Sequence, residues 1–377
     1  HRFEALWPLP YGVSYNSYLI DDEMVALVDT VDICYFEVYL RKIKQVIGER
    51  PINYLIINHM EPDHSGSIRL IKQHYPEIII VGNKQTFGMI EGFYGVTGEQ
   101  YLVKEGDFLA LGHHKLRFYM TPMVHWPETM MTFDETDGVL FSGDGFGCFG
   151  TVDGGFLDTQ INVDKYWGEM VRYYSNIVGK YGSPVQKALQ KLGGLPISAI
   201  CSTHGPVWTE NIAKVIGIYD RLSRYDADEG VVIAYGSMYG NTEQMAEAIA
   251  EELSAQGVKN IVMHNVTKSH PSYIIADIFR YKGLIIGSPT YSNQIFPEVE
   301  ALLSKILLRE VKGRYLGYFG SFTWAGAAVK RLAEFAEKSK FELVGDPVEM
   351  KQAMKDLTYT QCENLARAMA DRLKKDR

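Results

Sequence analysis

The sequence predicts an α/β protein with two domains. Its 377 residues exceed the size at which a single hydrophobic core usually serves a chain. The second half alternates short apolar runs with helical patterns, which is typical of parallel βαβ units. The first half also contains apolar runs, and several of them lead into a histidine or an aspartate. We therefore expect a doubly wound sheet in the second half, and a sheet core with polar residues at its rim in the first.

The second half shows strands, loops and helices in regular order. Residues 231–235 form a continuous apolar run, as expected for a parallel strand that is buried on both faces. Residues 243–256 place their apolar side chains on one helical stripe, and Gly257 follows as a plausible C-terminal cap. Residues 283–287 and 314–319 predict two further strands, each followed by a loop and a helical pattern.

A polar stretch at residues 225–230 marks the domain boundary, because it lies just before the first apolar run of the second half. The sequence contains no internal repeat and no low-complexity segment. We therefore expect one domain at residues 1–226 and another at residues 227–377.

The composition excludes several classes of protein. A net charge of −8 argues against binding to nucleic acid or to an anionic membrane surface. No apolar run approaches the roughly 20 residues that a membrane-spanning helix needs. The four cysteines are scattered and form no Cys-x-x-Cys pair, so neither a disulfide framework nor a four-thiolate metal site is predicted. We expect a cytoplasmic protein in a reducing compartment.

Four predicted strands of the first half each lead to a polar side chain at their carboxyl end. A metal ligand must be held rigidly while its side chain stays reachable, and a strand end provides both conditions. The strands at residues 54–58, 115–119, 139–141 and 197–201 lead to His59, His125, Asp144 and His204, respectively.

The densest group of polar residues is His-Met-Glu-Pro-Asp-His at positions 59–64. His59, Glu61 and Asp63 alternate, so an extended stretch would point them the same way, and a turn near Pro62 would direct members of the group at two neighbouring metals. With the strand ends, the group offers four imidazoles and three carboxylates but no thiolate, which suits redox iron better than structural zinc. The predicted ligands are His59, Glu61, Asp63, His64, His125, Asp144 and His204.

Each of these residues also has a structural alternative. A single histidine after a strand is more often a hydrogen-bonded structural residue, and Asp144 lies in a Ser-Gly-Asp-Gly run that suits a turn. The coincidence of four strand ends with one dense cluster favours the metal site, in which Asp144 would bridge the two ions.

Three loops of the second half predict a phosphate and ring-binding site. Residues 237–242 lie between a strand and a helix, where hydroxyl groups, a glycine and free backbone N–H groups form an anion cradle. The other two loops follow strands at their carboxyl ends and supply aromatic side chains, although such residues also serve in turns and packing. The candidates are Ser237, Met238, Tyr239, Gly240, Asn241, Thr242, Ser288, Pro289, Thr290, Tyr291, Ser292, Asn293, Ser321, Thr323, Trp324, Ala325 and Gly326.

Both halves resemble one known family. Residues 59–67 resemble the metallo-β-lactamase-fold signature His-x-His-x-Asp-His, except that Glu61 replaces the second histidine. In that superfamily the histidine form is typical of zinc hydrolases, and the glutamate form is typical of flavodiiron proteins. An anionic oxygen donor favours the harder iron ion and its oxidised state. The runs at residues 6–10 and 14–18 also resemble that family, and residues 237–242 resemble the phosphate loop of flavodoxins.

The resemblance implies a metallo-β-lactamase-like αββα sandwich followed by a flavodoxin-like doubly wound parallel sheet. It implies two iron ions and FMN as cofactors, with Tyr15 and Trp126 as possible residues of the pocket. In some family members the histidine equivalent to His64 turns away, and a water replaces it. By the resemblance, His59, Glu61 and His125 would hold one iron, Asp63, His64 and His204 would hold the other, and Asp144 would bridge them.

The activity implied is that of a flavodiiron oxidoreductase, which reduces O₂ to water, NO to N₂O, or both. FMN would receive electrons from an external donor, such as a rubredoxin or a flavin or deazaflavin reductase system, because the sequence matches neither an appended rubredoxin nor a flavin-reductase module. A head-to-tail homodimer, or a dimer of such dimers, would place the FMN of one chain beside the irons of another. The alternatives are a dinuclear zinc hydrolase fused to a flavodoxin domain, and an electron-transfer flavoprotein with an inactive metal site.

Overall fold

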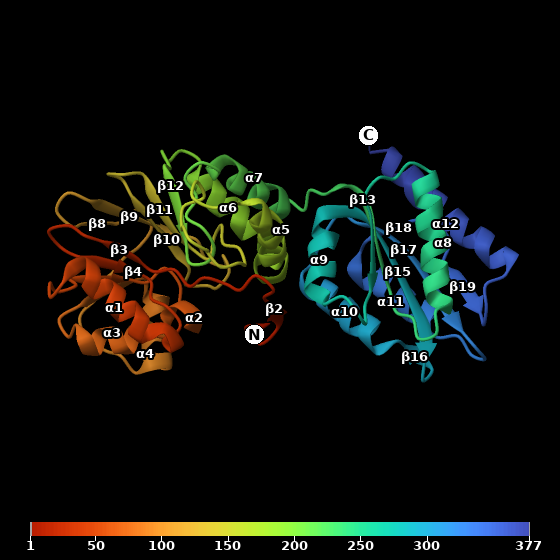
Figure 1. Cartoon of the computed structure of the whole chain (residues 1–377), viewed down its shortest axis with the longest axis horizontal. Coiled ribbons are helices and arrows are strands. Elements are labelled where there is room, and N and C mark those ends of the chain that lie inside the picture. The colour runs from red at the N-terminus through yellow and green to blue at the C-terminus, as the bar shows by residue number, and fades with distance from the viewer. Residues whose placement is uncertain (1, 377) are drawn as a thin grey trace. The chain divides into compact units, whose positions relative to one another are not determined.

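The structure, a computed structural model, describes residues 2–376 and divides into two compact units. The N-terminal unit comprises His1–Tyr174 and Tyr181–Ser223, and the C-terminal unit comprises Ser175–Lys180 and Arg224–Arg377. Figure 1 colours the first unit from red to green and the second from green to blue. No helix of the described chain has the length and apolar character that a membrane crossing requires.

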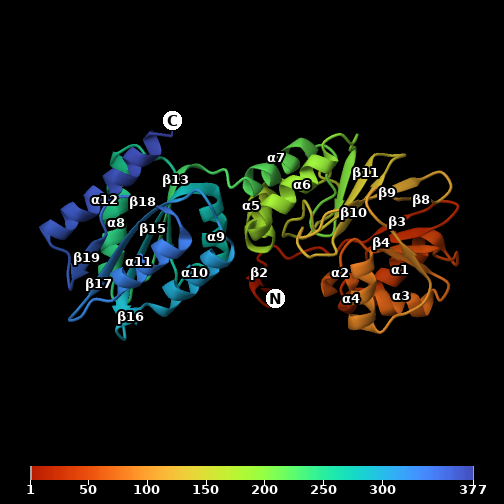
Figure 2. The same cartoon turned by 180° about the vertical axis from the view of Figure 1, so that it is seen from behind.

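The N-terminal unit is an αββα sandwich, as predicted. Two five-stranded sheets pack face to face, with helices on their outer faces, and the views from both sides agree on this layering (Figures 1 and 2). The first sheet contains β3 (Tyr18–Ile20), β4 (Ala26–Val28), β5 (Tyr54–Ile56), β6 (Ile79–Gly82) and β7 (Gln100–Leu102), in that order. The second contains β12 (Ala199–Ser202), β11 (Val139–Gly143), β10 (Met130–Asp134), β9 (Lys115–Met120) and β8 (Phe108–Ala110).

Strand alternation explains both layers of this core. Leu55 of β5 packs with the helices of the outer layer, whereas its neighbour Ile56 packs between the two sheets, because successive side chains of a strand point to opposite faces. A short hairpin of β1 (Arg2–Phe3) and β2 (Trp7–Pro8) precedes the sandwich. The helices are α1 (Phe36–Ile47), α2 (Pro62–Ser65), α3 (Ile68–His74), α4 (Lys84–Tyr94), α5 (Asp164–Tyr173), α6 (Gly182–Leu192) and α7 (Ile212–Ser223).

The C-terminal unit is the predicted doubly wound sheet. Its five parallel strands follow the order β14-β13-β15-β17-β18. The chain adds β14 on one side of β13 and the later strands on the other, so the switch point of the strand order lies between β13 and β15. The strands are β13 (Asp228–Tyr235), β14 (Ile261–Asn265), β15 (Tyr281–Tyr291), β16 (Gln294–Ile295), β17 (Tyr315–Phe322), β18 (Glu342–Leu343) and β19 (Val348–Lys351). The helices are α8 (Asn241–Ala255), α9 (Pro271–Arg280), α10 (Pro297–Leu308), α11 (Ala328–Ser339) and α12 (Asp356–Lys374).

The turn expected near Pro62 is the first turn of a helix. Glu61 is the extended N-cap of α2, and Pro62 begins that helix. Proline suits the first helical position because its missing N–H would have no partner there. Asp63 and His64 therefore lie on one helical turn, and their side chains meet, with Oδ1 of Asp63 at 3.2 Å from Nε2 of His64.

A buried guanidinium holds together the start of the C-terminal unit. Arg314 is only 1% exposed, and backbone carbonyl oxygens accept its hydrogen bonds: Tyr225 and Lys312 at 2.9 and 2.8 Å, and Ile278 and Phe279 at 2.7 and 3.0 Å. The last two carbonyls belong to the final turn of α9. Carbonyl groups in the last turn of a helix receive no hydrogen bond from within the helix, and that end carries partial negative charge. Burial lowers the pKa of Arg314 to about 10, so the group remains charged at neutral pH.

We predict that Arg314→Lys destabilises the C-terminal unit by roughly 2–4 kcal/mol, because one ammonium group cannot reach four carbonyls on different segments. Urea unfolding followed by the fluorescence of this unit measures the loss. The matched control is Arg367→Lys on the exposed face of α12, which should change the free energy of unfolding by about 0.5 kcal/mol or less. Equal effects of the two substitutions would contradict this role for Arg314.

Candidate functional site

The seven predicted ligands converge on one place in the N-terminal unit, although they come from five segments. Both sheets contribute, because the carboxyl ends of their central strands meet at the same edge of the sandwich. His59 and Glu61 follow β5, Asp63 and His64 lie on α2, His125 lies between β9 and β10, Asp144 follows β11, and His204 follows β12.

Asp144 lies between two pairs of histidines. Its Oδ2 is 3.0 Å from Nε2 of His125 and 3.6 Å from Nε2 of His59, which we call the first pair. Its Oδ1 is 3.1 Å from Nε2 of His64 and 3.5 Å from Nε2 of His204, which we call the second pair. Each oxygen of one carboxylate thus faces a different pair, as a bridging ligand must.

The other two carboxylates follow the same division. Glu61 places Oε2 at 3.0 and 3.5 Å from the Nε2 atoms of the first pair. Asp63 places Oδ1 and Oδ2 each 3.2 Å from the Nε2 atoms of the second pair. Two sets of donors therefore share Asp144, and each set contains two imidazoles and one further carboxylate.

Several buried atoms in this cluster lack a hydrogen-bond partner among the described residues. They include Nε2 of His59 and His204, both ring nitrogens of His64, and both carboxylate oxygens of Asp63. A buried polar atom left unpaired costs about 1–3 kcal/mol. Metal ions between these atoms would satisfy most of them at once, so the donor set fits a dinuclear site.

The electrostatics of the cluster also require added positive charge. Burial alone would lower the pKa of His125, but hydrogen bonds and charge interactions with Asp144 and Glu61 raise it to about 10. Burial likewise opposes ionisation of Glu61, yet the facing His125 and His59 lower its pKa to about 2. Glu61 and Asp144 are therefore ionised, and the imidazoles are drawn towards the charged form that metal ions would replace.

Hydrogen bonds from the second ring nitrogen, Nδ1, orient the imidazoles of His59 and His204. His59 donates from Nδ1 to Oε1 of Glu128 at 2.7 Å, and His204 donates from Nδ1 to the backbone carbonyl of Ser14 at 2.8 Å. In both rings the lone pair of Nε2 is left facing the centre. The sequence prediction did not include Glu128, although it lies only three residues after His125 in the segment Val-His-Trp-Pro-Glu-Thr.

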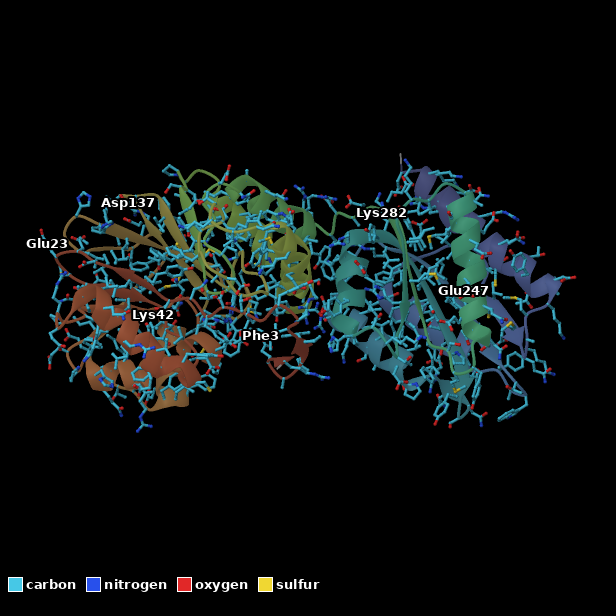
Figure 3. All side chains as sticks on the ribbon, in the orientation of Figure 1. Phe3, Glu23, Lys42, Asp137, Glu247 and Lys282 are labelled. Carbon is cyan, nitrogen blue, oxygen red and sulfur yellow. The ribbon has the colours of Figure 1, made fainter. Side chains whose placement is uncertain are left out.

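Aromatic rings enclose the cluster. The two predicted pocket residues both lie against ligands: the Trp126 ring is 5.2 Å from that of His59, and the Tyr15 ring is 5.7 Å from that of His204. Phe3, labelled in Figure 3, packs edge-on against His204 at 5.3 Å and was not predicted. These rings limit the access of water to the ligands.

Glu4, in the turn between β1 and β2, is a further acidic group that sequence reasoning missed. Its backbone is left-handed, with φ of 47°, and its side chain lies near the carboxylates of the cluster. In the absence of metal ions, desolvation of its carboxyl group and the charges of Glu61, Asp63 and Asp144 raise the pKa of Glu4 to about 8, although the residue as a whole is exposed. No periodicity or spacing in the sequence connects this residue with the cluster.

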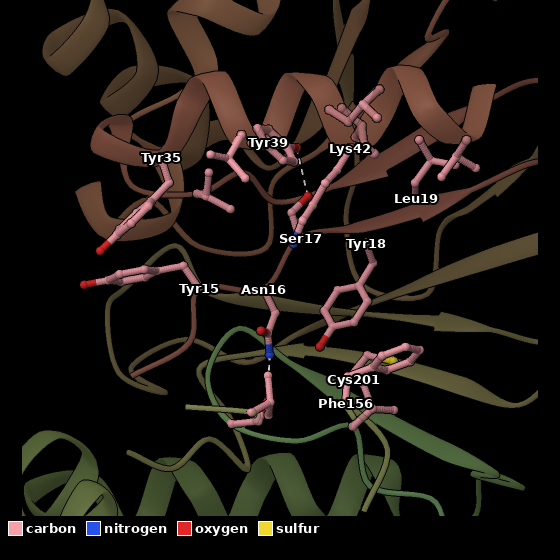
Figure 4. Close-up of a pocket in the computed structure, with 18 of the residues that line it drawn as sticks. Tyr15, Asn16, Ser17, Tyr18, Leu19, Tyr35, Tyr39, Lys42, Phe156 and Cys201 are labelled. Carbon is pink, nitrogen blue, oxygen red and sulfur yellow. Dashed lines mark hydrogen bonds between the residues drawn. The ribbon is translucent and has the colours of Figure 1, made fainter. Parts of the chain in front are cut away.

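A cavity of about 670 Å³ lies beside the loop that carries the last histidine ligand (Figure 4). Its polar groups serve the scaffold: Asn16 donates through Nδ2 to the carbonyls of Ser202 and Gly205 at 2.9 and 2.8 Å, and Tyr18 donates to Ser202. Tyr15 at the edge of the cavity also contacts the cluster. The side chains that line the cavity therefore hold the ligand loop in position.

The C-terminal unit contains a cleft of about 320 Å³ at the carboxyl ends of β13, β15 and β17. Nine predicted residues line it: Ser237, Met238, Tyr239, Asn241, Thr242, Pro289, Thr290, Ser321 and Thr323. Three lining residues were not predicted: Phe322, Gln352 and Ala353. The other predicted residues are not among those lining it: Gly240, Ser288, Tyr291, Ser292, Asn293, Trp324, Ala325 and Gly326.

The loop at the start of α8 has the geometry of an anion cradle. Gly240 is the N-cap residue and has φ of 90°, which a side chain would strain. Its N–H donates to Oγ of Ser237 at 3.1 Å, and the hydroxyls of Thr242 and Ser321 lie 2.8 Å apart across the cleft. The first N–H groups of α8 thus point towards a space bordered by hydroxyls, which fits a phosphate group.

Some predicted cleft residues have structural tasks instead. Ser288 is buried and accepts a hydrogen bond from the N–H of Phe296 at 3.1 Å. Thr290 lines the cleft but also accepts from the N–H groups of Ala327 and Ala328, at the start of α11. Ser292 and Asn293 form the left-handed turn between β15 and β16, with φ of 47° and 57°.

Comparison with known proteins covers both halves of the chain. Residues 13–205 match the ODP family beta lactamase, and residues 233–364 match the Flavodoxin family. A protein named nitric oxide reductase, from Moorella thermoacetica, is 31% identical over 368 residues, which are 96% of this chain and 91% of that protein.

Solved structures agree with this assignment. The rubredoxin oxygen:oxidoreductase from Desulfovibrio gigas superposes with a TM-score of 0.95 at 31% identity, over 99% of this chain and 94% of that chain. The flavodiiron protein from Giardia intestinalis gives a TM-score of 0.92 at 26% identity, over 100% of this chain and 93% of that chain. The order of the two matched families and the extent of these similarities show that the chain belongs to the flavodiiron protein family.

Proposed function

We propose that this oxidoreductase reduces O₂ to water, NO to N₂O, or both, with electrons that FMN receives from an external donor such as a rubredoxin or a flavin or deazaflavin reductase. The names nitric oxide reductase and rubredoxin oxygen:oxidoreductase among its relatives support the two substrates. The metal domain would comprise residues 1–226 and the FMN domain residues 227–377.

The observation that carries this proposal is the division of the donors around Asp144. One iron would bind the first pair of histidines with Glu61, the other would bind the second pair with Asp63, and Asp144 would bridge them. In this structure His64 points into the cluster, with Nε2 at 3.1 Å from Asp144, which supports its role as a ligand.

The residues around the metal site determine the polarity of the pocket and the supply of protons to a bound gas. Two iron ions, when bound, supply electrons to a diatomic molecule, and FMN supplies the further electrons that O₂ requires. Tyr15 and Trp126 present ring edges and faces beside the ligands, which favours a small apolar gas over a polar substrate. Both reductions consume protons, and the carboxyl group of Glu4, near the carboxylates at the edge of the site, is a candidate to supply them.

We also propose that two chains pair head to tail, so that the FMN of one lies beside the irons of the other. The ligand cluster belongs to the N-terminal unit and the cleft to the C-terminal unit. A single chain would have to transfer electrons from one unit to the other, whereas a pair of chains can place the FMN of one beside the irons of the other. Tyr239 and Trp324, which come from the loops of the cleft, are 89% and 83% exposed. Large exposed aromatic side chains are typical of surfaces that a partner covers.

Metal analysis tests the dinuclear site. The wild-type protein should bind about two iron ions per chain, and Asp144→Asn should reduce this to about one or fewer, because an amide cannot bridge two cations as a carboxylate does. Plasma mass spectrometry measures the content. The control is Asp137→Asn, in a separate group with His114 and Asp134, since Asp137 is exposed (Figure 3). Two zinc ions with esterase or lactamase activity would instead establish a hydrolase.

Binding of FMN to the iron-loaded, flavin-free protein tests the cleft. Asn241→Asp should raise the Kd about tenfold or more, because the new carboxylate repels the phosphate at the start of α8. Quenching of flavin fluorescence reports binding. Asn364→Asp makes the same change on the exposed surface of α12 and should leave the Kd unaltered. Equal affinity of both variants would place the phosphate elsewhere.

Mixed dimers test the pairing. The Asp144→Asn variant lacks the carboxylate that would bridge the irons. The Asn241→Asp variant lacks the flavin when FMN is limiting. A homodimer of either variant should therefore be inactive. Co-expressed with different tags and purified as a mixed dimer, they should recover up to about half of the wild-type turnover, because one intact FMN then faces one intact metal site. Sedimentation should show a dimer or a dimer of dimers. A fully active monomer would refute the proposal.

A further inference from the structure

The four candidate histidine ligands differ in what their second ring nitrogen contacts. His59 faces the carboxylate of Glu128, with Nδ1 to Oε1 at 2.7 Å, whereas His204 faces a neutral carbonyl at 2.8 Å. Nδ1 of His64 is buried and has no hydrogen-bond partner among the described residues. The first pair therefore has a carboxylate hydrogen-bonded behind one of its rings that the second pair lacks among the described residues. The buried carboxylate of Asp29 interacts with His64 and His59 through its charge, but it accepts hydrogen bonds from Asn58.

The carboxylate of Glu128 is fixed in place. Its Oε1 also accepts from the N–H of Met60 at 2.9 Å, and its backbone carbonyl accepts from Nδ2 of Asn83, the N-cap of α4. The side chain is fully buried, and Oε2 has no partner in the described chain. With the Trp126 ring at 5.2 Å from His59, little water screens the charge.

A carboxylate behind a ligand imidazole makes the ring a stronger donor of electron density to its metal. A stronger anionic donor set stabilises the more oxidised metal ion, so that ion is harder to reduce. The first set of donors has Glu61 and one oxygen of Asp144, with Glu128 behind His59. The second has Asp63 and the other oxygen of Asp144, and no carboxylate of the described chain is hydrogen-bonded to the second ring nitrogen of His64 or His204.

We propose that Glu128 makes the two metals inequivalent: through His59 it lowers the reduction potential of the iron at the first pair, so that this iron is reduced last and oxidised first. Glu128 is a positioning residue, since it acts through His59. The inference rests on the proposed diiron function and deepens it, because it assigns an order to the two ions.

The test is Glu128→Gln in the protein loaded with iron and FMN. The amide oxygen of glutamine keeps both hydrogen bonds and removes only the charge. In a redox titration followed by low-temperature electron paramagnetic resonance, the lower of the two iron midpoint potentials should rise. The mixed-valence signal should then appear over a narrower range of potential. The FMN midpoints, read from the visible spectrum, are the internal control and should not move.

Two further variants separate charge from packing. Glu128→Asp keeps the charge on a shorter side chain and should restore part of the wild-type separation of the iron potentials. Glu91→Gln removes a charge from the exposed surface of α4 and should shift neither potential.

The inference is overturned if Glu128→Gln retains its iron with unchanged potentials, or if both potentials shift equally. Loss of iron from this variant also overturns it, because the carboxylate would then serve in metal retention rather than in tuning. Wild-type protein that binds zinc in place of iron would contradict the proposed function and this inference together, before any variant is compared.

Discussion

The central constraint on the N-terminal unit is the burial of three carboxylates and four imidazoles around a single point. Asp144 alone lies within 3.6 Å of four imidazole nitrogens, and both of its oxygens are used. Such a concentration of negative charge is stable only if cations are present, as protons or as metal ions. The positions of α2, the ligand loops and the β1–β2 hairpin all follow from the need to enclose this charge.

The sequence predicted most of this site because strand ends are visible as apolar runs that stop at a polar residue. It could not predict Glu128 or Glu4, because neither stands at the end of a recognisable apolar run and only the fold brings them to the cluster. The turn near Pro62 was predicted but its helical type was not, because the alternation of His59, Glu61 and Asp63 suggests a strand as readily as a helical turn.

In the C-terminal unit the same reasoning found the loops of the cleft. It did not distinguish the loop residues that line the cleft from those that support the backbone. The phosphate loop is recognisable because its hydroxyls and glycine lie between a clear strand and a clear helix. Gln352 and Ala353 escaped prediction because the fifth strand position is divided between β18 and β19, and the chain after β19 turns back to the cleft. Ser288 was assigned to the cleft but supports the backbone, which composition alone cannot distinguish.

The origin of the ligands in both sheets has a mechanical consequence. Each histidine pair takes one member from the segment that follows β5 of the first sheet, His59 or His64 on α2. The other member, His125 or His204, comes from a loop that follows a strand of the second sheet. A metal ion held by either pair is therefore a cross-link between the two halves of the sandwich. Its binding energy adds to the energy that holds the sheets together, because the unfolded chain offers no comparable site. Removal of the ions would thus loosen the whole sandwich as well as abolish redox chemistry.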